Sequence, residues 1–179
     1  MDLFFWRWIA IICTGLLVLP AAAQWKDWDY DLDQEKKPWE ELQTQLPSYP
    51  KAENLLKFDM GSNTANSYFV DAASLSVGDD KVVRYTLVIK TAGGATNVSF
   101  EGIRCDGRQL RVYAFGHATR GWSRSRDAGW RDLLKLDLNG HHNVLYRDIL
   151  CTQTRNRQVA AVKDIISTLK RGGPGVSSY

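Results

Sequence analysis

The feature that most constrains the fold is a stretch, residues 82–115, in which apolar and polar side chains alternate and two turn signals interrupt the alternation. Its first segment, residues 82–90, is rich in β-branched and aromatic side chains with a period of two, which is typical of a strand. A loop over residues 91–94 follows, and its glycines can adopt the positive φ of a hairpin turn. Because Asp106–Gly107 is a second hairpin signal, the stretch predicts a three-stranded antiparallel meander.

Pairing the strands across these turns predicts which side chains share a face of the meander. A four-residue first loop places Tyr85 opposite Phe100 and Arg84 opposite Glu101, so that apolar residues meet and opposite charges meet. The second turn then places Tyr113 beside Phe100, which gives one face a row of three aromatic rings. The other face carries the apolar residues Val82, Val88, Ile103, Leu110 and Val112. Both faces of the predicted sheet therefore need a cover.

The two ends of the chain supply candidate covers. Residues 157–170 carry one apolar helical stripe, which consists of Val159, Val162, Ile165, Ile166 and Leu169. The glycines at 172 and 173 end this predicted helix. At the other end, residues 24–54 form an acidic, extended arm rich in tryptophan and proline, with a short helix expected over residues 39–45. We expect the arm to be a strap whose aromatic side chains cover the second face, since exposed indoles are costly.

Shorter elements connect the arm to the meander. Residues 55–60 and 67–70 alternate as strands do, and residues 71–75 are typical of a capped helical turn with Asp71 as its N-cap. Residues 144–151 fit either a helix or a strand. The sequence therefore predicts an α+β fold in which an antiparallel sheet of about five strands packs against a C-terminal helix.

The N-terminus has the features of a secretory signal peptide. Arg7 precedes an apolar run over residues 9–19, and the alanines at 21–23 form a small-residue cleavage site. We expect cleavage after Ala23 and export to the periplasm, with no transmembrane segment left in the mature chain. The alternative is a retained N-terminal anchor, since residues 3–6 can extend the apolar run around a single arginine.

Export bears on the cysteines, because the compartment outside the cytosol is oxidising. Cys13 lies within the signal peptide, so Cys105 and Cys151 remain and are expected to form one disulfide. The bond closes a long loop and should stabilise the fold by about 4 kcal/mol on the chain-entropy model. The alternatives are a metal site, which lacks further cysteine ligands nearby, and a redox pair, which lacks the C-x-x-C spacing.

An irregular segment after the meander interleaves basic and indole side chains. Its candidate binding residues are Arg120, Trp122, Arg124, Arg126, Trp130 and Arg131. On a polyanion-binding surface, indoles stack and guanidinium groups pair with phosphate or carboxylate. The alternative is structural, with both indoles plugging the sheet edge and the arginines exposed to solvent.

The sequence carries no recognisable catalytic motif. Neither a G-x-S-x-G elbow nor an H-E-x-x-H pair occurs. The predicted turn at 139–143 contains His141 and His142, but adjacent histidines point apart on extended backbone and lack a third ligand nearby. We therefore expect no catalytic residues, no metal and no cofactor. A hydrolase would need a site assembled in space from residues such as His117, His141 and Asp127.

Several of these segments resemble the cryptic neisserial protein (CNP)-like family of small exported bacterial proteins. The resemblance extends from about Trp39 to Cys151 and rests on VDAASLSVGDDKVVRYTLVI, NVSFEGIRC, RVYAFG and the paired tryptophans at 122 and 130. It implies a bacterial envelope protein of uncharacterised activity and transfers no catalytic residue. Residues 55–171 are accordingly expected to form a single domain of this family, followed by a flexible tail at 172–179.

These observations leave three functions open. The first is a non-enzymatic binding or assembly module whose basic and aromatic surface binds an envelope protein, a glycan or an anionic lipid headgroup. The second is a periplasmic hydrolase with a spatially assembled site, and the third is a stable scaffold without a ligand. The net charge of +3 is modest, with an acidic arm before a basic body. Nucleic acid is not an expected partner in the periplasm.

Overall fold

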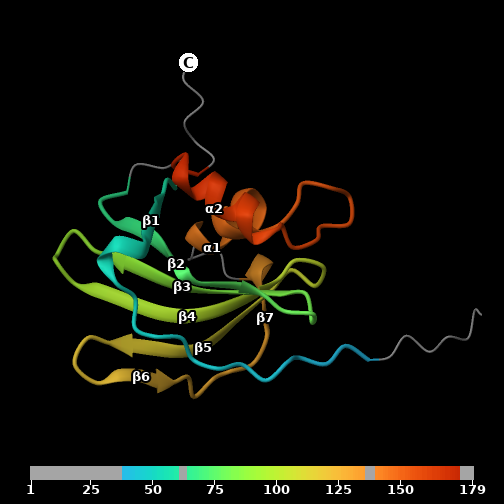
Figure 1. Cartoon of the computed structure of the whole chain (residues 1–179). Helices are drawn as coiled ribbons and strands as arrows, with labels where there is room; N and C mark the ends of the chain where they lie inside the picture. Colours follow the sequence, from blue (N-terminus) through green and yellow to red (C-terminus); the bar gives the residue numbers. More distant parts are fainter. Residues whose placement is uncertain (1–37, 61–63, 136–139, 174–179) are drawn as a thin grey trace, which may run out of the picture. The chain divides into compact units, whose positions relative to one another are not determined.

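The structure of the chain, a computed structural model, describes residues 38–60, 64–135 and 140–173. These residues form a seven-stranded antiparallel sheet with helices on one face (Figure 1). The strands are β1 (Leu55–Phe58), β2 (Ser67–Val77), β3 (Val82–Lys90), β4 (Thr96–Arg104), β5 (Gln109–His117), β6 (Gly121–Arg124) and β7 (Arg131–Asp132). The helical elements are η1 (Ala52–Asn54), η2 (Leu133–Lys135), α1 (Gly140–Val144), η3 (Leu145–Leu150) and α2 (Val162–Lys170).

The strands follow one another as a meander in the order β1-β2-β3-β4-β5-β6, and β7 also pairs with β5. The predicted α+β class with an antiparallel sheet is confirmed, although the sheet has more than the five strands expected. The expected signal peptide, the first part of the arm and most of the expected tail lie outside the described residues.

The turn between β3 and β4 has five residues instead of the four predicted, because Lys90 pairs with Thr96. Within the turn, the backbone N–H of Thr91 donates to the Ala95 carbonyl at 2.9 Å. The Ala95 N–H in turn donates to the Thr91 hydroxyl at 3.1 Å, and Gly94 adopts a positive φ of 83°. The threonine side chain therefore closes a wider loop than the glycines alone indicate.

This extra residue shifts the register of β3 against β4, so the predicted cross-strand pairs are wrong. Tyr85, and not Arg84, lies opposite Glu101. A one-residue shift transfers the side chains of a strand to the other face, so Tyr85 does not share a face with Phe100 and Tyr113. The rings of Phe100 and Tyr113 still touch, with centroids 5.5 Å apart, but on the face that points away from the helices.

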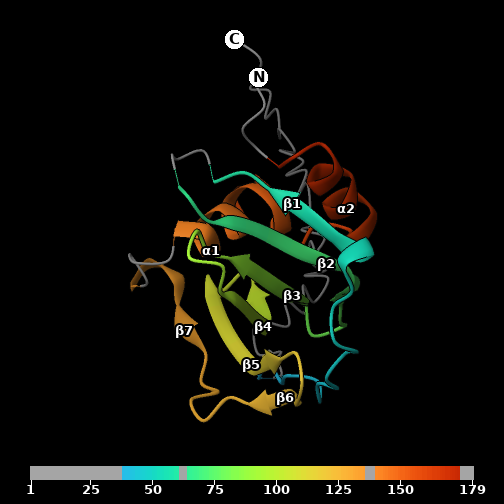
Figure 2. The same ribbon diagram turned by 90° about the vertical axis from the view of Figure 1, so that its left-hand side faces the viewer.

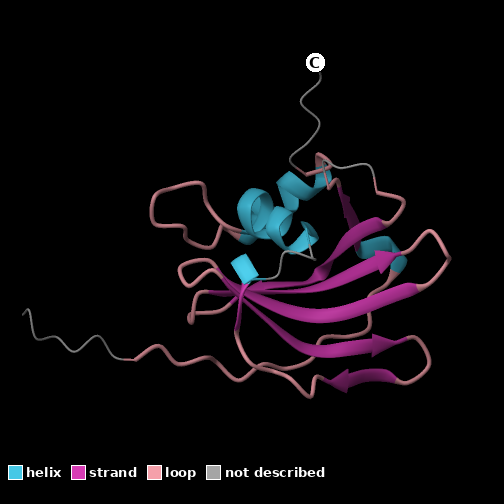
Figure 3. Ribbon diagram, turned by 180° about the vertical axis from the view of Figure 1, so that it is seen from behind, coloured by secondary structure: helices cyan, strands magenta, loops and turns pink. Residues whose placement is uncertain are grey.

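The hydrophobic core lies between the sheet and the layer of α1, η3 and α2 (Figure 3). Its fully buried side chains come from both layers and include Phe58, Tyr85, Leu87, Ile103, Leu110, Leu145, Leu150, Ile165 and Leu169. The apolar residues predicted to share the second face are in fact divided between two sides. Ile103 and Leu110 belong to the core, whereas Val82 and Val88 alternate with core residues of β3 and face away from it.

A disulfide ties the C-terminal part of the chain to the sheet. Cys105 and Cys151 are joined as predicted, with Cα atoms 5.7 Å apart and a sequence separation of 46. The chain reaches Cys151 through η3, so the segment before it is helical and not a strand. Val159 then forms a β-bridge with Cys151, and for this reason α2 begins at Val162 and not at residue 157.

The helical turn predicted over residues 71–75 is wrong, because β2 continues through it to Val77. The pairing of β2 with β3 is irregular between Asp71 and Ser76. Ser74 stabilises this irregular stretch, since its hydroxyl donates to the Asp71 carbonyl at 3.0 Å and accepts the N–H of Thr86 at 2.9 Å. A side-chain hydroxyl thus replaces a missing backbone bond of the ladder.

Residues 38–50, which we call the strap, cross the face of the sheet opposite the helices (Figures 1 and 2). They are extended, without the short helix predicted there. The carboxylate of Glu41 accepts hydrogen bonds from Arg111, from the Tyr113 hydroxyl at 2.7 Å and from Trp130 Nε1 at 3.0 Å. Charge-assisted bonds of this kind are stronger than neutral ones, so Glu41 anchors the strap to the sheet.

A second anchor joins the strap to the turn between β2 and β3. The Asp80 carboxylate accepts the backbone N–H of Leu42 at 2.9 Å and binds Arg84 at 2.5 and 3.1 Å. Arg84 also donates to the Thr44 hydroxyl at 2.9 Å. Burial raises the pKa of Asp80, but the bonds from Arg84 and the backbone outweigh it and hold that pKa below its ordinary value. Arg84 therefore pairs with Asp80 and not with the predicted Glu101.

Replacing the strap anchor tests this arrangement. We expect Glu41→Ala to lower the free energy of unfolding by about 3 kcal/mol, because it leaves an arginine, a phenol and an indole without their acceptor. Glu40 is exposed and adjacent, so Glu40→Ala is a matched control that should change stability by less than about 0.5 kcal/mol. Denaturant unfolding measures both variants, and equal effects would show that Glu41 does not anchor the strap.

Candidate functional site

The six predicted binding residues lie along one edge of the sheet. Their positions are the turn before β6 (Arg120), β6 (Trp122 and Arg124), the loop that follows (Arg126 and Trp130) and β7 (Arg131). Both strands pair with β5, which brings this edge segment beside the end of the strap. The segment thus runs along this edge, where its tryptophans and its arginines have different surroundings.

The two indoles of the edge segment contact the strap. Trp122 Nε1 donates to the Pro47 carbonyl at 2.7 Å, and its ring centroid lies 6.1 Å from those of Phe100 and Tyr49. Trp130, whose Nε1 binds the strap carboxylate, makes an edge-on contact with Trp39 at 5.7 Å. The indole N–H groups are therefore already satisfied within the fold, and both rings help to hold the strap in place.

The four arginines of the edge segment are exposed, and within the described residues none of them forms an ion pair. The nearest acids in sequence bind backbone groups instead. Asp127 accepts the N–H of Gly129 at 3.5 Å, and Asp132 accepts that of Leu134 at 2.9 Å. The edge therefore presents guanidinium groups that are free to bind phosphate or carboxylate. Their role in binding remains a prediction.

A second cluster of polar side chains lies inside the fold, around the carboxylate of Glu101. It accepts hydrogen bonds from the Tyr85 hydroxyl at 2.8 Å and the Ser99 hydroxyl at 2.6 Å, and it lies 2.9 Å from His142 Nε2. Burial raises the pKa of Glu101, but the charge of His142 and these hydrogen bonds lower it to about 2. The cluster joins β3, β4 and α1, since His142 lies in the short helix that replaces the predicted turn.

His141 and His142 lie side by side in α1, with ring centroids 4.1 Å apart. His141 stacks on Tyr68 at 5.4 Å. Burial, and then the charge of His142, lower the pKa of His141 to about 4. Among the described residues, Nδ1 of His142 has no hydrogen-bond partner. The neutral form of His141 is therefore favoured in the folded chain.

The residues named for a hydrolase do not come together. Across the described part of the chain, no hydrogen bond or ring contact joins His117, His141 and Asp127. The structure instead pairs His142 with Glu101, two residues that the sequence did not single out as partners. Glu101 stands out in the sequence as an acid among the apolar residues of a strand. The wrong register of β3 against β4, however, predicted Arg84 as its partner.

A histidine within hydrogen-bond distance of a carboxylate is a possible acid–base pair. Here both residues are buried, with 6% of His142 and 3% of Glu101 exposed, and neither lines any of four surface cavities of about 190 to 470 Å³ in the described part of the chain. Ser99 donates to Glu101 and not to His142, so the histidine does not activate it as a nucleophile. The geometry favours an anchor that holds α1 on the sheet.

Two further features bear on the kind of site the fold can contain. Within the described ranges, no group of three or more His, Cys, Asp or Glu side chains is arranged to hold a metal ion. In the same ranges, no helix has the length and apolar character to cross a bilayer.

The lowered pKa of His141 predicts a pH dependence of stability. Between pH 6.5, the ordinary pKa, and about pH 4, the unfolded chain binds a proton at this residue that the folded chain does not. Stability should therefore fall as the pH falls through this range. His141→Phe keeps the stacking on Tyr68 but removes the titration. Between about pH 7 and about pH 5, the free energy of unfolding of the wild type should therefore fall by about 2 kcal/mol more than that of this variant.

His117→Gln is the control for this measurement, because it removes a histidine elsewhere in the chain and should leave the pH-dependent loss unchanged. Denaturant unfolding at each pH gives the free energies. If His141→Phe and wild type show the same pH dependence, His141 does not carry the effect.

The comparison with protein-family models supports an assignment to a family. The model of the CNP1-like family matches residues 34–170, which include all the strands and helices described above. No curated protein and no solved structure matches the chain significantly. The match covers the meander, both cysteines of the disulfide and the strap, and it confirms the resemblance found in the sequence. The chain belongs to the CNP1-like family.

Proposed function

We propose that this bacterial protein is exported to the envelope and acts there without catalysis, by binding an anionic group of another envelope component. The observation that carries the proposal is the row of exposed arginines along the β6–β7 edge, which have no carboxylate partner among the described residues. Membership of the CNP1-like family is consistent with this proposal but names no activity.

The arrangement of the edge segment supports binding to a surface. Trp122 and Trp130 hold the segment against the strap, so the backbone that carries its arginines needs little ordering when a ligand binds. Guanidinium groups form paired hydrogen bonds with phosphate and carboxylate. Arginines along an exposed edge, and not in a cavity, suit an array of anionic groups such as a lipid headgroup layer, an acidic glycan or an acidic protein surface.

Vesicles that contain anionic phospholipid provide the first test of the proposed surface. Arg120, Arg124 and Arg126 each contribute about 1 kcal/mol near an anionic bilayer, so their replacement by alanine together should weaken vesicle binding roughly 100-fold. The melting temperature should not change, because these side chains are exposed and make no ion pair with the described residues.

A second triple variant controls for net charge. Lys57, Lys163 and Lys170 are exposed and lie in β1 and α2, away from the edge segment, so their replacement by alanine removes the same charge. This variant should bind vesicles within about threefold of wild type, as a loss of non-local charge predicts. Equal weakening of vesicle binding in both variants would show that net charge alone accounts for the effect. Unchanged binding in the arginine variant would rule out the proposed surface.

Export is tested on the protein isolated from cells. We expect it in the periplasmic fraction, with Gln24 as its first residue, because cleavage after Ala23 follows from the small-residue site. N-terminal sequencing or intact mass measures this directly. A chain that begins at Met1 and sediments with the membrane would instead establish the retained anchor.

A further inference from the structure

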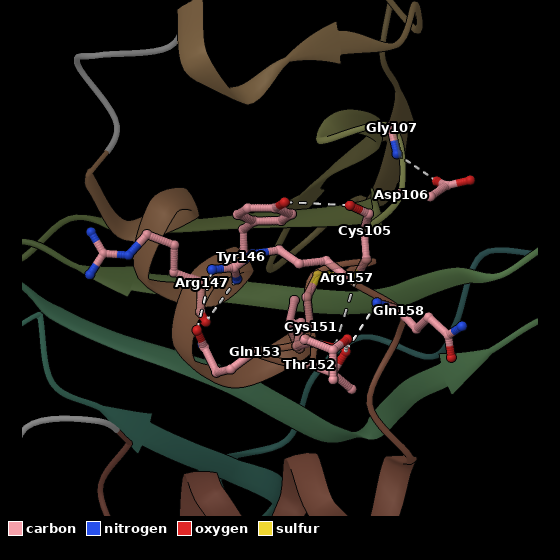
Figure 4. Close-up of a disulfide and its surroundings, with 12 residues drawn as sticks. Cys105, Asp106, Gly107, Tyr146, Arg147, Cys151, Thr152, Gln153, Arg157 and Gln158 are labelled. Carbon is pink, nitrogen blue, oxygen red and sulfur yellow. Dashed lines mark hydrogen bonds between the residues drawn. A yellow bond between two sulfur atoms is a disulfide. The ribbon is translucent and has the colours of Figure 1, made fainter.

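A basic groove lies beside the disulfide, and it shares no residue with the edge segment. It has a volume of about 410 Å³ and is bounded by the β4–β5 turn, by η3 and by the loop that leads from Cys151 to α2. Three arginines line it, Arg108, Arg155 and Arg157, together with Tyr146, Asn156 and Gln158. Figure 4 shows Tyr146, Arg157 and Gln158 around Cys105.

Positive charge in this groove is not compensated by its one carboxylate. Asp106 also lines the groove. Its carboxylate accepts the N–H of the next residue, Gly107, at 2.6 Å and lies 3.4 Å from Arg104, which is outside the groove. Within the described residues, Arg108 and Arg155 form no ion pair. The groove is therefore set to attract an anion.

Arg157 is held in place by neutral groups alone, so that its charge stays available. It donates to the Arg147 carbonyl at 3.1 Å and to the Gln153 amide oxygen at 3.2 Å, and its guanidinium lies 5.0 Å from the centre of the Tyr146 ring (Figure 4). The loop that carries it is closed at its base, where the N–H of Thr152 donates to the Gln158 carbonyl at 2.8 Å. The cation is thus preorganised, which lowers the cost of binding.

An apolar cavity of about 470 Å³ adjoins the basic groove, and the two share Cys105, Asp106, Arg157 and Gln158. The walls of this second cavity are formed mainly by Val77, Val159, Ala160, Ala161 and Val162, and Lys81 also lines it. Val77 is 37% exposed at the end of its strand, so an apolar side chain of the sheet is accessible from this hollow. A basic groove and an apolar cavity therefore meet at Arg157.

We propose that the two cavities together bind a single-chain anionic amphiphile, with its carboxylate or phosphate head on Arg155 and Arg157 and its alkyl chain along Val77 and Val159. Charge complementarity selects the head group, and burial of the chain supplies the apolar contribution. Cavities of this size accommodate small ligands. This site and the proposed edge surface share no residue.

Binding of decanoate, measured by calorimetry below its micelle concentration, tests the proposal. Acetate has the head without the chain, and decanol has the chain without the charge, so each should bind at least tenfold more weakly than decanoate. Decyl phosphate should bind at least as well as decanoate if the guanidinium groups accept either head. If decanoate binds no more tightly than acetate, or no more tightly than decanol, the proposal is wrong.

Variants locate the site. Arg155 is exposed and has no hydrogen bond or ion pair within the described residues, so Arg155→Ala should weaken decanoate binding about tenfold without unfolding the chain. Val77→Ser should also weaken it, but should leave the weak binding of acetate unchanged. Arg171→Ala removes an exposed arginine outside both cavities and should have no effect.

The triple alanine variant of Arg120, Arg124 and Arg126 should bind decanoate as wild type does. Loss of decanoate binding in that variant, with unchanged binding in Arg155→Ala, would place the ligand on the edge and overturn the groove proposal. Because vesicle binding and decanoate binding depend on different arginines, each proposal can fail while the other stands.

Discussion

Apolar residues occupy both faces of this sheet, and the requirement to cover two faces governs the rest of the structure. The helices cover one face, where the Cys105–Cys151 disulfide and the contact between His142 and Glu101 hold them. The strap covers the other face, where Glu41 accepts donors from β5 and from the loop before β7. Each cover combines apolar contact with a polar anchor, and the anchor determines where the cover lies.

The use of acids as internal anchors affects the charge of the surface. Glu41, Asp80 and Glu101 are hydrogen-bonded inside the fold or under the strap, so they do not neutralise the exposed arginines of the loops. A chain with a net charge of only +3 can therefore present two basic regions, one along the β6–β7 edge and one beside the disulfide. The regions differ in shape. The edge suits an extended array of anionic groups, whereas the groove has an apolar neighbour and suits one small molecule.

The same indoles that make the edge segment resemble a binding surface have a structural role. Trp122 and Trp130 donate their N–H groups to the strap, and this separates the two halves of the predicted site. The tryptophans position the segment, and the arginines remain exposed to solvent. Sequence alone does not distinguish these roles, because an indole beside arginines has the same pattern whether it faces the strap or the solvent.

The sequence by itself determined the strands of the meander, the second hairpin turn, the disulfide and the family, because these depend on local periodicity, on turn residues and on the two cysteines outside the expected signal peptide. The register was missed for a local reason, since the Thr91 hydroxyl closes a loop of five residues and this changes which side chains share a face. The tertiary structure decided that the partner of Glu101 is His142, 41 residues away, and that the basic groove meets the apolar cavity. Contacts of this range depend on how whole elements pack, and no local pattern of residues contains that information.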